Sequence, residues 1–240
     1  VIDYCLAQEI EPNVTLFHYD LPKAISDEGG WENRAIIDAF AAYARVCFEA
    51  FGDRVKLWVT INEPKYYAYC SNMVGNYPPN HRHDFNRYFT TVYHEAVASA
   101  KAVAIYHDMQ LDGKIGIVHD SSNVELAPDA KEKERIKLIA DLFYNRIILD
   151  TAMKGELPGS LIPLLREYQI ETSFIKFEDM LTFQKGIIDF LGLNVYNRFY
   201  ITDYTEGETE VFHNNKGAGS NAKEGIRIRD WYETTIDPDT

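Results

Sequence analysis

The chain has 240 residues, of which 46% are apolar, with 24 Lys or Arg against 37 Asp or Glu and a formal net charge of −13. This apolar content suffices for a sizeable core and excludes a disordered chain, while the acidic balance argues against a general binder of the nucleic-acid backbone, which needs a basic surface. No run of eighteen apolar residues occurs, so no membrane-spanning helix is predicted.

The first half of the sequence predicts alternating strands and helices. A short apolar strand covers Val14–Phe17, and Glu32–Phe51 has the spacing of a helix with one apolar face, ending before Gly52. A second strand is predicted over Val55–Ile61, followed by a long helix over Arg87–Met109.

The second half continues the alternation. It predicts a strand over Lys114–Val118, a largely helical segment over Pro128–Lys154, a shorter helix around Leu161–Tyr168 and a strand over Ile187–Leu193. No internal repeat or flexible linker divides the chain, so residues 1–240 are predicted to form a single, incomplete domain.

Alternating strands and helices require a parallel sheet, either open and doubly wound or closed into a barrel. An open nucleotide-binding sheet would carry a Gly-rich loop after a strand, and none of the four strands has one. Polar and aromatic residues follow the strands instead, which is typical of a (β/α)8 barrel with its chemistry at the carboxyl strand ends, although closure needs eight strands. These segments are His18-Tyr19-Asp20, Asn62-Glu63-Pro64, His119-Asp120 and Asn194-Val195-Tyr196.

Glu63 is the leading catalytic candidate. A carboxyl group at the end of a parallel strand points into a barrel mouth, where partial burial suits a general acid. Asn62 beside it can both donate and accept hydrogen bonds, as a sugar hydroxyl requires. The alternative is a strand-terminating Asn-Glu-Pro turn on the surface.

The histidines and cysteines leave fewer options. His18, with the phenol and carboxylate that follow it, suits a polyhydroxylated ligand, and a structural histidine is the alternative. His81 and His83 could form a surface pair, but no Cys or carboxylate set stands at metal-ligand spacing. The cysteines are odd in number and form no CxxC pair, so neither a disulfide scaffold nor a zinc ribbon is expected. They are Cys5, Cys47 and Cys70.

Six segments together resemble glycoside hydrolase family 1, the β-glucosidase and 6-phospho-β-glucosidase family. They are Glu11–Pro22, Gly30-Trp31, Phe51–Pro64, Phe143–Arg146, Lys154–Pro158 and Phe190–Tyr196. The T-x-N-E-P element at Thr60–Pro64 is the most specific of them. The resemblance implies a partial TIM (β/α)8 barrel, about strands three to six of eight, and hence the central part of a longer protein.

The resemblance also implies roles for individual residues. Glu63 matches the family's acid/base glutamate, and Asn62 matches the asparagine that holds the 2-hydroxyl of the sugar at the cleavage point. His18 matches the histidine that hydrogen-bonds the 3-hydroxyl. Asn194 and Tyr196 match residues near the nucleophile, where the tyrosine hydroxyl holds the nucleophilic carboxylate in place.

Three features depart from the family pattern. Tyr19 stands where the family usually has Trp, and Val195 where it usually has Tyr. The family's retaining mechanism uses two carboxyl groups about 5–5.5 Å apart, and its nucleophile lies in a T-E-N-G element that this sequence lacks. Glu206 and Glu210 follow threonines in a polar, Gly-rich stretch and are poor substitutes. The sequence thus predicts a retaining β-glycosidase whose nucleophile is missing from the chain, and the alternatives are an inactive truncated fragment or a sugar-binding pseudo-enzyme.

An incomplete barrel would expose two parallel edge strands, so a homo-oligomer formed through those edges is expected. The resemblance implies a β-linked glucoside or disaccharide as the ligand, no cofactor, and neither nucleic acid nor membrane as a partner, with Lys65, Tyr66 and Tyr67 on the leaving-group side. The chain begins at Val1 without a secretory leader, and a cytoplasmic location is therefore expected. Whether the sugar is plain or 6-phosphorylated stays open.

Overall fold

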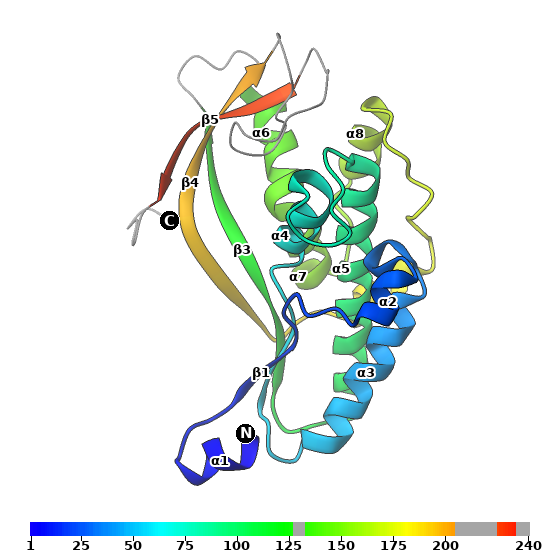
Figure 1. Ribbon diagram of the computed structural model, residues 1–240, viewed down its shortest axis with the longest axis vertical. Coiled ribbons are helices and arrows are strands. Elements are labelled where there is room, and N and C mark those ends of the chain that lie inside the picture. Colours follow the sequence, from blue (N-terminus) through cyan, green and yellow to red (C-terminus); the bar gives the residue numbers. More distant parts are fainter. Residues whose placement is uncertain (127–132, 205–224, 234–240) are drawn as a thin grey trace.

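The computed structural model describes residues 1–126, 133–204 and 225–233, in which five strands form one sheet in chain order (Figure 1). The strands β1 to β4 pair in parallel, and β5 runs antiparallel to β4. The expected parallel sheet of a partial barrel is therefore confirmed. The strands are β1 (Asn13–Phe17), β2 (Leu57–Asn62), β3 (Lys114–Leu126), β4 (Phe190–Tyr204) and β5 (Gly225–Glu233).

Helices connect the parallel strands and pack on one side of the sheet, which is the outer side in a barrel (Figure 1). After α1 (Ile2–Ala7), the connection from β1 to β2 holds α2 (Lys23–Asp27), a 3-10 turn η1 (Gly30–Glu32) and α3 (Ile36–Phe51). The next connection holds α4 (Pro64–Tyr69), a π-helical turn η2 (Cys70–Val74) and α5 (Phe85–Asp108). The third holds α6 (Lys133–Asp141), a π-helical turn η3 (Leu142–Arg146), α7 (Ile147–Lys154), α8 (Leu161–Glu167) and α9 (Asp179–Lys185).

The core lies between the sheet and these helices. On α3, Phe40, Ala44 and Phe48 recur at helical spacing and are all buried. The ring of Phe48 packs edge-on against Trp58 of β2, with centroids 5.0 Å apart, and Trp58 is fully buried. At its other end the sheet meets α5, where the hydroxyl of Thr60 lies 2.6 Å from that of Ser99. Burial of these apolar faces fixes the strand register, and the register determines which residues lie together at the carboxyl ends of the strands.

Two strands extend further than the sequence predicts. The expected strand ends at Val118 and Leu193 are wrong, because pairing between β3 and β4 continues to Leu126 and Ile201, past a register shift between Ser121 and Asn123. The ladder of backbone hydrogen bonds does not depend on apolar side chains, so polar residues continue it. The antiparallel β5 was not predicted either.

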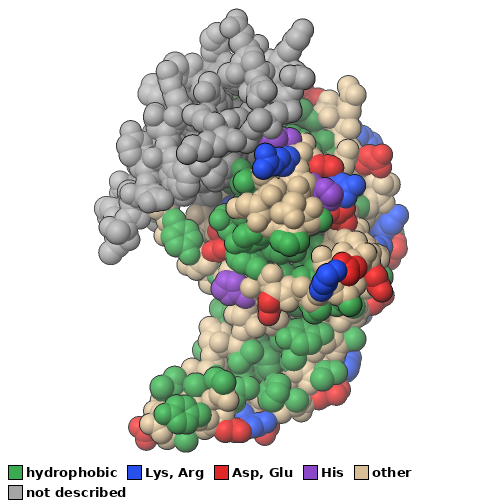
Figure 2. Space-filling model, viewed as in Figure 1, with side chains coloured by type: hydrophobic (Ala, Val, Ile, Leu, Met, Phe, Trp, Pro, Cys, Tyr) green, Lys and Arg blue, Asp and Glu red, His purple; other side chains and the backbone are tan. Residues whose placement is uncertain are grey.

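The two edges of the sheet differ from the predicted pair of open edges. Within the described residues β1 pairs only with β2, whereas β4 is covered by β5 from Asn197 onward, so its outer edge is open only over its first half. Leu193 and Val195 in that half are 54% and 40% exposed. Figure 2 shows further exposed hydrophobic side chains in the lower part of the molecule, where α1 and α3 lie in Figure 1. Assembly through these edges remains a prediction, and none of the described helices is long and apolar enough to cross a membrane.

A partly buried ion pair joins residues far apart in the sequence and gives a first test of the fold. Asp179, 5% exposed at the start of α9, accepts two hydrogen bonds from the Arg34 guanidinium, at 2.6 and 3.0 Å, and one from the Tyr93 hydroxyl at 2.7 Å. We expect Asp179→Ala to lower the free energy of unfolding by about 3 kcal/mol, because buried donors lose a charged acceptor. Urea denaturation measures this. Asp27→Ala, which breaks an exposed pair with Lys23, should cost less than about 1 kcal/mol, and equal costs would contradict the argument.

Candidate active site

The site forms around Glu63, where β2 ends and α4 begins. Asn62 is the last residue of β2 and Pro64 the first of α4, so the backbone must turn sharply at Glu63, which adopts a left-handed conformation with φ of 48°. The Glu63 amide donates to the Val118 carbonyl of β3 at 2.8 Å, which anchors the turn to the neighbouring strand. The residue is only 7% exposed, so the alternative of a surface Asn-Glu-Pro turn is wrong.

The carboxylate of Glu63 accepts hydrogen bonds from residues on either side of β2. The Tyr19 hydroxyl, just after β1, donates to Oε2, and the Asn194 amide on β4 donates to Oε1. Side chains from just after β1, from the end of β2 and from within β4 thus converge at one carboxyl group. This is the arrangement expected of side chains at the carboxyl edge of a parallel sheet.

The other predicted site residues lie around Asn62. Its amide nitrogen is 3.3 Å from His18 Nε2 and 3.2 Å from the Tyr19 oxygen, and its amide oxygen accepts from Asn194 at 3.4 Å. The structure therefore brings His18, Asn62, Glu63 and Asn194 into one hydrogen-bonded group. Tyr196 lies at the rim with 60% exposure, and burial together with the nearby Glu63 and Asp120 charges raises its pKa.

A second carboxyl group, Asp120 on β3, adjoins Glu63, and sequence analysis missed its role. It forms an ion pair with Lys65 of α4, and both side chains are largely buried, 12% and 6% exposed. Lys65 also lies 5.3 Å from the centroid of the Tyr144 ring. Burial, together with the charge of Glu63, raises the pKa of Asp120 to about 6 against the opposing charge of Lys65. The expectation that Lys65 faces a ligand from a loop is therefore wrong, since it is a buried helical residue with a carboxylate partner.

His119, next to Asp120 on β3, makes folding sensitive to acid. It is fully buried with Nε2 3.2 Å from the Asn145 amide oxygen, and burial, with the charge of Lys65, lowers its pKa to about 3. Between that value and about 6.5 the unfolded chain binds a proton that the folded chain excludes, so stability falls as the pH is lowered. We expect His119→Gln to flatten the pH dependence of the unfolding free energy by about 1 kcal/mol per pH unit between pH 6 and 4. Parallel profiles of both proteins in urea denaturation would refute this.

A cleft lined with aromatic residues adjoins Glu63. Tyr19 is the centre of its wall, stacked on Tyr67 with centroids 5.9 Å apart and in contact with Tyr77 at 5.7 Å. Tyr66, 36% exposed, lies 6.2 Å from Tyr19. The cleft has a volume of about 480 Å³, and flat rings at its edge suit the apolar faces of sugars. Its lining consists of Tyr19, Leu21, Lys23, Ser26, Asp27, Tyr67, Tyr77 and Pro78.

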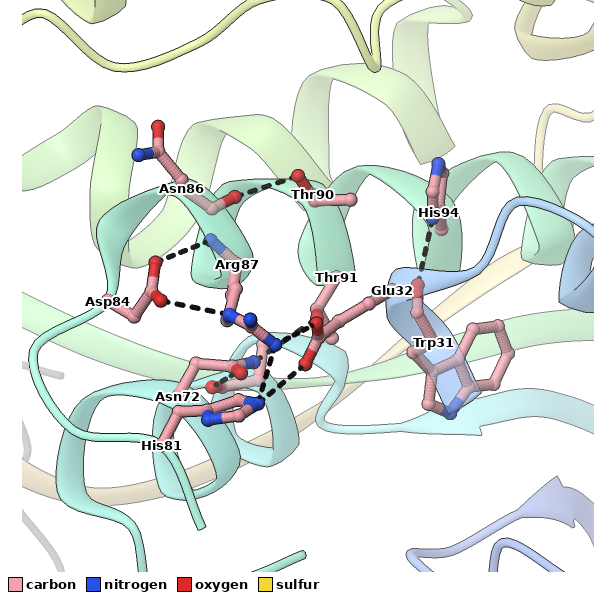
Figure 3. Close-up of polar contacts among 11 residues, drawn as sticks. Trp31, Glu32, Asn72, His81, Asp84, Asn86, Arg87, Thr90, Thr91 and His94 are labelled. Atoms are coloured by element: carbon pink, nitrogen blue, oxygen red, sulfur yellow. Dashed lines mark hydrogen bonds and ion pairs between the residues drawn. The ribbon is translucent and has the colours of Figure 1, made fainter. Parts of the chain in front are cut away.

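A separate polar cluster lies beyond this cleft, between η1 and the start of α5 (Figure 3). Arg87 donates to Glu32 at 2.6 Å and lies 2.9 Å from Asp84, while His81 Nε2 is 3.3 Å from Glu32. His81 is thus engaged in an ion network and does not form the isolated surface pair with His83 that the sequence suggested. Among the described residues no three His, Cys, Asp or Glu side chains are grouped as a metal site would require. Glu206 and Glu210 lie outside the described residues.

Comparisons with known proteins show the family and the fold. The model of "Glycosyl hydrolase family 1" matches residues 1–238. A 6-phospho-beta-galactosidase of Clostridium acetobutylicum is 37% identical over 90% of this chain and 47% of its own length, and the 6-phospho-beta-glucosidase GmuD of Bacillus subtilis is 38% identical over 82% and 42%. The solved family 1 β-glucosidase of Thermotoga maritima superposes with a TM-score of 0.77 and 34% identity, over 95% of this chain and 48% of that one. The chain thus spans about half the length of the curated relatives that it matches.

Proposed function

We propose, on the premise that the chain belongs to glycosyl hydrolase family 1, that it supplies the acid/base half of a retaining β-glycosidase active site. The observation that carries this proposal is the position of Glu63. Its carboxyl group is almost fully buried at the mouth of the sheet, and Tyr19, just after β1, and Asn194, within β4, donate hydrogen bonds to its two oxygens.

Two carboxyl groups perform the proposed reaction. In the first step, a nucleophilic carboxylate forms a bond to the anomeric carbon as the bond from that carbon to the glycosidic oxygen breaks. Glu63 donates its proton to this oxygen, which leaves as an alcohol. In the second step, Glu63 accepts a proton from the water molecule whose oxygen replaces the nucleophile on that carbon. We assign the nucleophile to no described residue, because Asp120, the other carboxyl group at this edge, is occupied by Lys65. Both steps use side-chain carboxyl groups, so the proposal needs no cofactor.

The neighbouring residues suit recognition of the sugar on either side of the scissile bond. Asn62 and His18 form one hydrogen-bonded group beside Glu63, which supports contacts from them to adjacent hydroxyls of one ring. Asn194 and Tyr196 extend this group along β4. The tyrosine-lined cleft on the other side of Glu63 would hold the leaving group by stacking.

A β-glucoside or a 6-phospho-β-glucoside is the proposed substrate class. The names of the two curated relatives support a phosphorylated sugar, whereas the name of the Thermotoga maritima protein supports a plain one. A doubly charged phosphate does not cross the hydrocarbon layer of a membrane unaided. A 6-phosphorylated substrate would therefore place the protein in the cytoplasm, in line with its three unpaired cysteines Cys5, Cys47 and Cys70.

Hydrolysis by the full-length protein tests the proposal. We expect release of p-nitrophenol from p-nitrophenyl β-glucoside or from its 6-phosphate, with a large difference in kcat/KM between the two that identifies the substrate. Proton NMR of the first product formed should show the β-anomer, because two displacements retain configuration. Formation of the α-anomer would refute the retaining mechanism, and the absence of hydrolysis from both compounds and from the two matching β-galactosides would refute the enzyme.

A sugar-binding protein without turnover is the second candidate, since Asp120, the carboxyl group beside Glu63 on β3, is paired with Lys65. In that case the full-length protein would bind glucose or glucose 6-phosphate in a calorimeter yet hydrolyse neither glycoside. For the 240-residue chain by itself we propose association through the open edges of β1 and β4. Light scattering that reports a stable monomer would contradict this.

A further inference from the structure

We propose that Tyr19 is a positioning residue for Glu63, whose phenol holds the carboxylate in its ionised form and in the orientation needed to accept a proton from water. The inference rests on the proposed role of Glu63 and goes beyond it by assigning a proton-directing function to the residue after His18. It stands on the hydrogen-bond pattern, the backbone geometry and the packing of the tyrosine ring.

The hydrogen-bond pattern fixes the direction of the phenol proton. The Asn62 amide nitrogen, which can only donate, is 3.2 Å from the Tyr19 oxygen. The Tyr19 oxygen therefore accepts from Asn62, and its own proton is directed to Glu63 Oε2. The Asn194 amide donates to the other oxygen, Oε1. Hydrogen bonds donated to both oxygens are stronger when the carboxyl group is ionised, so the arrangement favours the ionised carboxylate.

The backbone at both partners is unusual. Tyr19 has φ of 75° and Glu63 has φ of 48°, so each adopts the left-handed conformation that side chains with a Cβ rarely occupy. Such conformations cost of the order of 1–3 kcal/mol each and persist where the surrounding structure imposes them. Here they aim the two side chains at each other from the ends of β1 and β2.

The ring of Tyr19 is fixed by its neighbours. It stacks on Tyr67 at an interplanar angle of 28°, and His18 and Tyr77 contact it with centroids 4.9 and 5.7 Å away. Burial, followed by the hydrogen bond to Glu63 and its charge, raises the pKa of Tyr19, so the phenol keeps its proton throughout the neutral range. A rigid, protonated donor is what a positioning role requires.

Other ionisable groups also face Glu63. A test of the Tyr19 hydroxyl must leave these groups unchanged. The nearest charge is the ion pair of Asp120 with Lys65. The remaining groups with an electrostatic influence from or on Glu63 are Tyr66 and Cys70 on α4 and η2, Tyr77 in the following loop, and Tyr196 on β4. Removing the hydroxyl of Tyr19 alone leaves all of them in place.

The two reaction steps should respond differently to loss of this donor. The second step, in which water transfers its proton to Glu63, gains from an ionised and oriented carboxylate, so Tyr19→Phe should slow it about tenfold. The first step uses protonated Glu63, so its kcat/KM falls at alkaline pH, where Glu63 loses its proton. In Tyr19→Phe this fall should move to higher pH. A substitution that merely loosened the cleft would raise KM and leave the pH profile in place.

A direct titration tests the inference without relying on turnover. In full-length protein labelled with ¹³C at glutamate carboxyl carbons, the Glu63 signal is identified by its loss in Glu63→Gln. We expect its titration midpoint to rise by about one pH unit in Tyr19→Phe. Tyr67→Phe, which removes a hydroxyl from the ring stacked on Tyr19, is the matched control and should leave the midpoint unchanged.

Incorporation of 3-fluorotyrosine at position 19 keeps the ring and its packing. The titration can therefore be measured in this protein even if Tyr19→Phe does not fold. Its more acidic phenol is a stronger donor and should lower the Glu63 midpoint. Opposite shifts in these two proteins support the inference, and unchanged or parallel shifts overturn it. If the wild-type protein hydrolyses no glycoside, the proposed function fails, but the titration still decides the role of Tyr19.

Discussion

Replacing Glu63 with glutamine is expected to lower kcat for an unactivated β-glycoside, such as an alkyl glucoside, by about 10²–10⁴-fold. The amide keeps the size and most hydrogen bonds of the side chain, but it cannot transfer a proton to the glycosidic oxygen. With p-nitrophenyl as the leaving group, protonation matters less, so the first step should slow far less than with the alkyl glycoside. Steady-state rates of the full-length protein on both substrates measure this difference.

Glu95 offers a matched control for the same chemical change. It lies on α5 with a fully buried carboxyl group, and burial raises its pKa well above the ordinary range. Burial thus disfavours the ionised form of Glu95, and glutamine has a similar shape, so Glu95→Gln should leave the kinetics nearly unchanged. Equal activity of Glu63→Gln and wild type on the alkyl glycoside would remove Glu63 from the mechanism.

The fold follows from sequence wherever burial decides the structure. The helical spacing of Phe40, Ala44 and Phe48 predicts α3 because these side chains must pack against the sheet, and they do. The extension of β3 beyond Val118 was not predictable in this way, since His119 and Asp120 interrupt the apolar run. Backbone pairing with β4, a segment distant in sequence, is what continues that strand.

Part of the site is also encoded locally. The order Asn62, Glu63, Pro64 places a carboxyl group where a strand ends, and parallel pairing brings His18 and Asn194 to the same edge. Their roles, as well as that of Tyr196, stay predictions. The hydrogen bond from Tyr19 depends on left-handed backbone at both partners, which side-chain periodicity does not reveal.

The pairing of Lys65 with Asp120 was missed because it joins residues 55 positions apart through the register of β2 and β3. One signal in the sequence points to it. Lys65 stands in the segment Pro64–Tyr69, whose other residues are apolar or aromatic, and a lysine buried in such a segment requires a partner. An aspartate at the end of the adjacent parallel strand is the nearest candidate.

This ion pair should dominate the stability of the carboxyl edge of the sheet. Lys65→Met leaves Asp120 buried without a countercharge, and Asp120→Asn leaves the Lys65 ammonium buried in the same way. Each single substitution is expected to lower the free energy of unfolding at pH 7 by about 3–5 kcal/mol. Protonation of Asp120, whose pKa already lies near 6, should limit the cost of Lys65→Met and make it smaller at pH 5 than at pH 8.

The double variant separates the pair from its parts. Lys65→Met with Asp120→Asn removes both charges and keeps similar volumes, so it should be more stable than either single variant, with a coupling energy of at least about 2 kcal/mol in urea denaturation. The exposed pair of Lys101 and Asp38, 42% and 77% exposed, is the matched control and should show a coupling below about 1 kcal/mol. If the effects of the two buried substitutions simply add, the charges do not depend on each other. Lys65 would then be free to face the cleft beside Glu63, as the sequence first suggested.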